Sequence, residues 1–196
     1  MRLFRRGVLA ALSLALAGCA QLPGFAPAKP AAALVLSAPP ATFRLEGRVS
    51  VKAGEESFSG GLAWKRGDGG EELLLNTPLG QGVAEIRADA TGVRLTDAKG
   101  QSHQAPDPDS LVRQALGLEL PLRGLGWWVV GHPRPQASYR AEPDEAGRLA
   151  WLEQDDWRIE FSRYAPHAQT VLPGKLVAKR GEDMEVRLVV DRWELP

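Results

Sequence analysis

From Phe43 onward, apolar residues recur at every second position of the chain. In the first such run Phe43, Leu45, Gly47, Val49 and Val51 alternate with charged and polar residues. Successive side chains of a β-strand point to opposite faces of the sheet, so a period of two predicts a strand with one buried and one solvated face. Such strands are typical of antiparallel sheets. The pattern therefore predicts a largely antiparallel β fold.

The same alternation returns along the rest of the chain and is interrupted by short turns rich in Gly, Pro, Asp and Asn. We expect about ten or eleven strands, joined mainly as hairpins. They cover residues 43–52, 58–64, 73–76, 83–88, 93–96, 101–104, 138–141, 148–154, 157–163, 175–179 and 184–193.

Two helices are expected in one insertion within this series of strands. Asp107 and the acidic residue after it favour a helix start, and an apolar stripe from Leu111 to Leu116 ends at Gly117. A second, shorter helix is expected after Pro121. A sheet of this size can curl into an incomplete barrel whose open side the helices cover. The predicted fold class is therefore mainly β, of the α+β type.

The N-terminus has the pattern of an export signal. A basic start precedes an apolar segment, residues 7–17, that is too short to span a bilayer as a folded helix. Leu16-Ala17-Gly18-Cys19 then places small residues directly before the only cysteine of the chain. This stretch resembles the bacterial lipobox, which implies that residues 1–18 are removed and that Cys19 is acylated on its thiol and its amine. The alternative is an ordinary secretory signal with a chance cysteine.

Residues 19–41 are expected to form a tether between the acylated Cys19 and a folded domain over residues 42–196. Five prolines among many alanines favour an extended chain over a strand or an uninterrupted helix. At roughly 3 Å per residue the tether would reach up to about 60 Å. One short helical turn at residues 31–36, or a contact of these residues with the domain, remains open.

Composition argues against several functions. The chain has 24 basic and 24 acidic residues, and the signal contains three of the arginines, so the mature form would carry three net negative charges and no basic patch for nucleic acid. Once Cys19 is acylated, no thiol remains for a disulfide. The three histidines are far apart, and the chain shows no nucleophile with its base, no metal-ligand spacing and no phosphate loop. We therefore expect no enzyme activity, no cofactor and no metal.

A series of short motifs supplies a resemblance that covers most of residues 43–196. In chain order the motifs are Phe43-x-Leu45-x-Gly47-Arg48, Gly60-x-x-x-Trp64, Asn76-Thr77-Pro78-Leu79-Gly80, Leu116-Gly117, Leu120-Pro121-Leu122, Leu125, Trp128-x-x-Gly131-x-Pro133, Gln154-x-x-Trp157, Leu172-Pro173 and Trp193. The set resembles the LolB family of outer-membrane lipoprotein receptors. Two departures are the Pro/Ala-rich residues 20–41, where the family often has a polar helix, and Asp156, where the family has glycine.

The resemblance implies a LolA/LolB-like fold, an incomplete antiparallel barrel with helices over an apolar cavity. It also implies a passive function, in which triacylated lipoproteins are accepted from a LolA-like periplasmic carrier and inserted into the lipid of the outer membrane. The protein would be a monomer anchored through Cys19 on the periplasmic face of that membrane. Ala20, in place of aspartate after Cys19, favours the outer membrane.

Candidate functional residues follow from the same resemblance. Leu79, framed by Pro78 and Gly80, would be a membrane-facing tip; the alternative is that it packs over the end of the sheet. The candidates for the acyl-chain cavity are Phe43, Leu45, Val49, Phe58, Leu62, Trp64 and Leu74 on the sheet and Trp128 on the helices. Ordinary core packing also accounts for each of them. Two other functions remain as alternatives: a scaffold lipoprotein with a filled barrel, and a lipid hydrolase.

Overall fold

The computed structural model describes residues 32–117 and 120–196. The expected signal, Cys19 and most of the tether lie outside the described residues. Within them, 11 strands form one antiparallel sheet in the order β6-β5-β4-β3-β2-β1-β13-β12-β9-β8-β7. The strands before the helices are β1 (Phe43–Ala53), β2 (Glu56–Gly67), β3 (Gly70–Asn76), β4 (Gly82–Asp89), β5 (Gly92–Asp97) and β6 (Ser102–Ala105).

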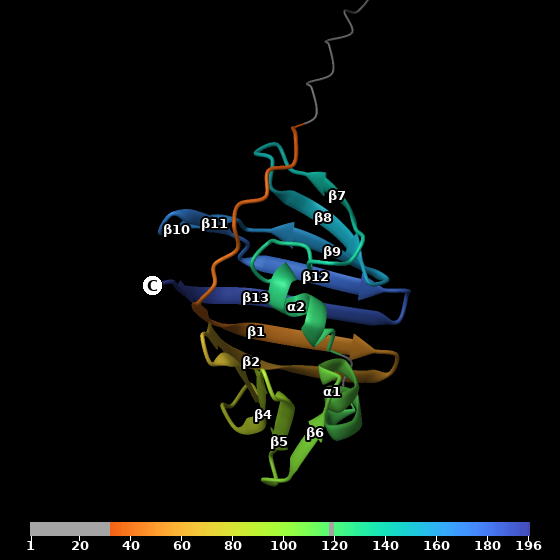
Figure 1. Cartoon of the computed structure of the whole chain (residues 1–196). Helices are drawn as coiled ribbons and strands as arrows, with labels where there is room; N and C mark the ends of the chain where they lie inside the picture. Colours follow the sequence, from red (N-terminus) through yellow and green to blue (C-terminus); the bar gives the residue numbers. More distant parts are fainter. Residues whose placement is uncertain (1–31, 118–119) are drawn as a thin grey trace, which may run out of the picture. The chain divides into compact units, whose positions relative to one another are not determined.

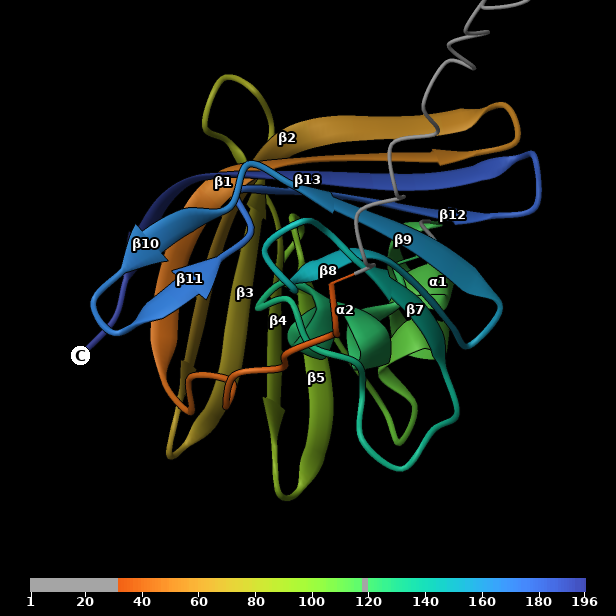
Figure 2. The ribbon, with the colours of Figure 1, turned by 90° about the horizontal axis from the view of Figure 1, so that it is seen from above.

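The strands after the helices build the other half of the sheet. They are β7 (Arg140–Pro143), β8 (Leu149–Gln154), β9 (Trp157–Ser162), β12 (Lys175–Arg180) and β13 (Met184–Glu194). The first and last strands pair in the middle of the order, with Val49 opposite Leu188, and β6 and β7 are the two edges. The sheet therefore curls without closing, around α1 and α2 (Figures 1 and 2). The predicted fold class, an incomplete antiparallel barrel with helices on its open side, is confirmed.

Close approach of β1 to β13 requires a glycine at one point. The pairing of the two strands shifts register between Glu46 and Gly47. A Cβ atom at Gly47 would lie 2.3 Å from the carbonyl oxygen of Val189, closer than two such atoms can approach. A glycine in a strand often marks such an irregularity.

Both helices follow β6 and precede β7 in the chain, and they pack on the concave side of the sheet. Helix α1 (Pro108–Leu116) begins at Asp107, whose side chain accepts a hydrogen bond from the Ser110 N–H at 3.1 Å, and ends at Gly117 with a φ of +67°. These are the caps expected from the sequence. Helix α2 (Leu122–Trp128) follows Pro121, also as expected. Within the described part of the chain, no helix has the length and apolar character needed to cross a bilayer.

One element differs from the sequence-based expectation. A separate two-stranded hairpin, β10 (Ala165–His167) and β11 (Thr170–Leu172), occupies a stretch where no strand was expected. These strands have three residues each and include Pro166, so they show no apolar alternation long enough to detect.

The candidate site on the concave face and in the Leu79 loop

The structure gathers six of the eight cavity candidates on the concave face of the sheet. These six are buried, five on the sheet and the last on α2: Phe43, Leu45, Val49, Leu62, Trp64 and Trp128. Phe58 is half-buried and packs against the same core. The shared face of β1 and β2 was correctly predicted from the alternation.

Leu74 is the exception, and its assignment to the concave face is wrong. Its side chain is 39% exposed on the outer face, because Leu74 pairs with Ala63 while its neighbours Leu73 and Leu75 pair with Trp64 and Leu62. Three consecutive leucines give no alternation, so the sequence does not show which of them face inward.

The concave face also includes residues that the candidate list omitted. Strands on both sides of β1 contribute to one buried cluster with α1 and α2. Its further members include Leu73, Leu75, Ile86, Leu95, Leu111, Leu152, Ile159, Ala178, Val186 and Leu188. The alternation in β4, β5, β9 and β13 would have identified Ile86, Leu95, Ile159, Val186 and Leu188.

The concave face is filled in this conformation. Leu95, Trp128 and Leu152 are each 0% exposed, so they touch no space large enough for a water molecule, inside the protein or outside it. A methylene group is no smaller than water, so no hydrocarbon chain fits beside these three side chains as they stand. Access of a ligand to them requires the helices to move.

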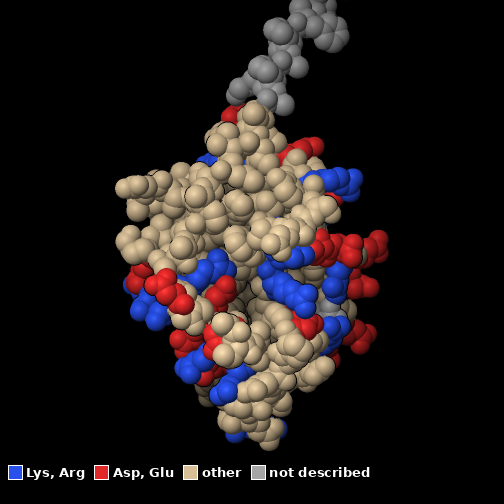
Figure 3. Space-filling view, viewed as in Figure 1, with Lys and Arg blue, Asp and Glu red and all other residues tan. Residues whose placement is uncertain are grey.

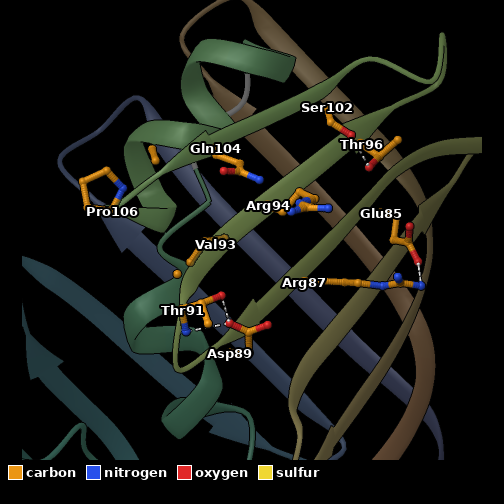
Figure 4. A pocket seen from close by; sticks show the side chains of 12 residues that line it. Glu85, Arg87, Asp89, Thr91, Val93, Arg94, Thr96, Ser102, Gln104 and Pro106 are labelled. Atoms are coloured by element: carbon orange, nitrogen blue, oxygen red, sulfur yellow. Dashed lines mark hydrogen bonds and ion pairs between the residues drawn. The ribbon is translucent and has the colours of Figure 1, made fainter.

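Grooves of about 790 and 530 Å³ lie on the outer face instead, and another of about 630 Å³ lies beside the β8–β9 turn. The first is lined by outward side chains of β4, β5 and β6, and Figure 4 shows charged and hydroxyl groups around it, including the Thr91–Asp89 and Thr96–Ser102 pairs. Polar groups of this kind would lose their hydration against hydrocarbon. This groove is therefore unsuited to an acyl chain.

A buried hydrogen-bond set holds the end of α2 to the sheet. Gln154, at the end of β8, accepts from the indole N–H of Trp128 at 3.0 Å and from the backbone N–H of Arg134 at 2.7 Å. Its amide group donates to the carbonyl of Arg134 at 2.9 Å. Gln154 is a buried polar side chain whose hydrogen bonds all go to α2 and the segment after it.

An arginine that was not predicted from the sequence holds α2 to the other half of the sheet. Arg66, on the concave face of β2, donates to the carbonyl of Gly126 in α2 at 2.6 Å and to Glu71 at 2.8 Å. Its guanidinium lies over the rings of Phe43 and Trp127 at 4.9 and 5.9 Å. Glu71 also accepts from the indole N–H of Trp64 at 3.0 Å. Polar contacts therefore fix α2 to both halves of the sheet.

The Leu79 loop joins β3 to β4 and projects from the sheet. The Gly80 N–H donates to the Thr77 carbonyl at 2.9 Å, and the Gln81 N–H donates to the Thr77 hydroxyl at 3.1 Å. Gly80 has a φ of +84°, which glycine adopts without strain. Leu79 at the tip is 90% exposed, so the alternative in which it packs over the sheet end is wrong. The turn holds one aliphatic side chain in solvent.

Comparison with known proteins shows the family to which the chain belongs. The family model described as "Outer membrane lipoprotein LolB" matches residues 41–193. The chain belongs to the LolB family. An outer-membrane lipoprotein LolB from Thiobacillus denitrificans is 41% identical over 97% of each chain. Another from Pseudomonas paraeruginosa is 38% identical over 78% of this chain and 74% of the relative.

Solved structures similar to this LolB chain share its fold. One is a putative outer membrane lipoprotein-sorting protein domain from Vibrio parahaemolyticus, with a TM-score of 0.51 and 10% identity over 79% of this chain and 85% of that one. Another is a LolA superfamily protein from Nitrosomonas europaea, with a TM-score of 0.50 and 8% identity over 81% and 88% of the two chains. The open sheet with its helices is therefore a fold that this chain shares with a LolA superfamily protein.

Several LolB motif residues of this chain have structural roles. Trp128 and Gln154 are hydrogen-bonded, as described above, and the Trp128 and Trp157 rings lie 6.4 Å apart. Trp193 donates to the carbonyl of Pro173 at 3.4 Å, and its ring meets that of Phe43 edge-on at 5.4 Å. These residues fix the helices and the last strand to the sheet.

Proposed function

We propose that this LolB chain accepts acylated lipoproteins from a LolA-type periplasmic carrier and inserts them into the outer membrane. The concave face beneath α1 and α2 would hold the acyl chains during the transfer. The observation that carries this proposal is the combination, in a member of the LolB family, of a continuous apolar concave face with a cover of two helices. We propose a passive transfer, with no bond made or broken in the lipoprotein.

The physical need for such a face is large. An acyl chain with about 15 methylenes costs on the order of 12 kcal/mol to expose to water, at about 0.8 kcal/mol for each methylene. A triacylated lipoprotein carries three such chains. An apolar route from carrier to membrane removes most of this cost at every step.

The Leu79 loop is proposed as the membrane contact. Burial of one leucine contributes about 1.5 to 3 kcal/mol, which biases the loop toward lipid without fixing it there. Cys19, if acylated as its sequence context implies, would supply the lasting attachment to the outer membrane. The tether would then let the domain turn between carrier and bilayer.

The test is transfer of a labelled triacylated lipoprotein from a LolA-type carrier to this protein and then to outer-membrane vesicles. We expect Leu79→Glu to accept the lipoprotein normally and to deliver it poorly. Leu74→Glu is the matched control, since Leu74 is also exposed but lies on the outer face of the sheet, and we expect it to deliver normally. Lipoprotein that stays on the carrier in the presence of the wild-type protein would contradict the proposal and favour a scaffold with a filled barrel.

A further inference from the structure

Residues 32–42, here named the strap, cross the open side of the half-barrel. The strap runs from the β7–β8 turn past α2 to the start of β1, on the concave side of the sheet (Figures 1 and 2). It is extended, so of the two alternatives left open for this stretch a contact with the domain is correct for the described residues, and a helical turn is wrong. The strap lies across the opening that the helices leave uncovered.

The strap packs on the domain through alternate apolar side chains. Leu34 and Leu36 are half-buried and pack against the core, while Val35 between them is 66% exposed. The Val35 N–H donates to the carbonyl of Gly147 at 2.8 Å. The strap therefore presents two aliphatic side chains to the interior.

The β7–β8 turn is built to receive the strap. Gly147 has a φ of +82°, and a Cβ atom there would lie 2.9 Å from the carbonyl oxygen of Ala33. Asp144 fixes the turn by accepting from the N–H groups of Ala146 and Arg148, each at 2.9 Å. A glycine and an ordered turn thus let the strap backbone approach closely.

The surroundings of the strap favour an uncharged occupant. Figure 3 shows few charged side chains over β10, β11 and the first part of the strap; they gather instead along the right edge and in the lower half of the view. The strap itself contains no charged residue between Ala32 and Thr42. Two aliphatic side chains in line and the backbone hydrogen bond of Val35 make a contact of the strength expected of segments that open locally.

We propose that the surface beneath Leu34 and Leu36, here named the strap-binding surface, is where the hydrocarbon chain of a ligand first docks, and that the strap occupies it in the unliganded protein. This inference rests on the proposed function, because it assumes that acyl chains reach the concave face. A linear hydrocarbon and the two leucines have the same chemistry and compete for one surface. The apparent affinity of the protein for the hydrocarbon chain is then the intrinsic affinity multiplied by the fraction of molecules in which the strap is released.

Release of the strap also has a mechanical consequence. The strap is the last part of the expected tether, so a bound strap shortens the reach of the tether by about 30 Å, at roughly 3 Å per residue, and a freed strap restores it. Ligand uptake would thereby extend the reach of the domain.

A disulfide lock tests this proposal. The Cβ position at Gly147 lies 3.8 Å from the Cβ of Val35, the separation that disulfides require. We would introduce Val35→Cys and Gly147→Cys into the full chain carrying Cys19→Ser, and measure binding of a fluorescent fatty acid before and after reduction. We expect the oxidised protein to bind about tenfold more weakly than the same protein after reduction. Equal binding in the two states would overturn the proposal.

A second variant pair avoids the substitution at Gly147. In the same Cys19→Ser background, Leu34→Ser/Leu36→Ser removes the side chains that hold the strap, and we expect the fatty acid to bind about tenfold more tightly. Val35→Ser is the matched control, since Val35 is exposed, and we expect unchanged binding. Circular dichroism checks that each variant is folded.

The outcomes separate the two proposals. If the parent chain binds the fatty acid but neither the lock nor the leucine substitutions alter its affinity, the strap-binding surface is refuted and the proposed function stands. If no variant binds the fatty acid, both are refuted.

Discussion

The indole N–H of Trp128 donates to the side-chain oxygen of Gln154 across 3.0 Å, and Gln154 is only 3% exposed. This bond joins the last residue of α2 to the last residue of β8. Because the same oxygen also accepts from the Arg134 backbone, one side chain fixes both the end of the helical cover and the segment that leads away from it.

Replacement of this glutamine should therefore be costly. Gln154→Met keeps the approximate volume but leaves the Trp128 indole and the backbone of Arg134 without partners inside the protein. We expect a loss of about 3 kcal/mol in the free energy of unfolding, measured by urea denaturation. Gln101→Met, at an exposed glutamine, should change it by less than about 0.5 kcal/mol. A similar small change in both variants would refute the role assigned to Gln154.

Arg66 should control how readily the cover opens. Arg66→Met removes the donor to the Gly126 carbonyl, so we expect amide hydrogens of α2 and the following turn to exchange about tenfold faster or more. Arg87→Met removes an exposed arginine paired with Glu72 on the outer face, and should leave these rates unchanged.

A double variant separates the contact with α2 from the ion pair itself. Arg66→Met/Glu71→Met replaces both charges with apolar groups, which should recover part of the global stability. Exchange in α2 should nevertheless stay fast, since the Gly126 carbonyl still lacks its donor. Restored protection of α2 in this variant would show that Arg66 does not hold the helix directly.

Asp156 marks a turn that is not optimised for stability. Asp155 and Asp156 have φ values of +54° and +62° in the turn between β8 and β9, where Asp-Gly is the preferred pair. We expect Asp156→Gly to stabilise the protein by about 0.5 to 1 kcal/mol in thermal unfolding. Asp155→Gly should stabilise the protein by less, because this substitution also removes the ion pair with Arg134. A lower melting temperature for Asp156→Gly would contradict this account.

Asp144 should make the stability of the β7–β8 turn, which contacts the strap, depend on pH in the acid range. Burial raises the pKa of Asp144, but hydrogen bonds from the Arg148 side chain and from the backbone of Arg148 and Ala146 outweigh it and hold the pKa below the ordinary 3.8. The folded state thus binds the proton less well than the unfolded state, so this stabilisation is present above pH 3.8 and is lost as the pH falls through the lower folded pKa.

The corresponding measurement compares the wild-type protein with Asp144→Asn. We expect the variant to melt a few degrees lower at neutral pH, and the difference to shrink as the pH falls below 3.8. A difference that stays constant over this range would show that the charge of Asp144 is not the cause.

Local chemistry accounts for what the sequence predicted well. The helix ends at Asp107 and Gly117 depend on capping groups within a few residues, and the inward face of β1 follows from uninterrupted alternation. The assignment failed at Leu74, where three adjacent leucines leave the facing residue to be set by pairing with β2.

The remaining features depend on contacts between distant parts of the chain. Arg66 is one cation near the end of a strand, and only the fold brings it to Gly126, 60 residues later. The filled state of the concave face likewise arises from packing of α1 and α2 against strands from both halves of the sheet. Periodicity predicts an apolar face but not whether that face is open.

The central claim is that the concave face receives acyl chains when its cover moves. The most direct measurement is photo-cross-linking with a fatty acid that carries a photoreactive group at the end of its hydrocarbon chain, followed by mass spectrometry of the labelled peptides. We predict labels on concave-face residues of β2, β3 and β5, such as Leu62, Leu75 and Leu95, and less labelling when the strap is locked by its disulfide. Labels confined to the outer grooves beside Arg94 or Gly61 would contradict the account.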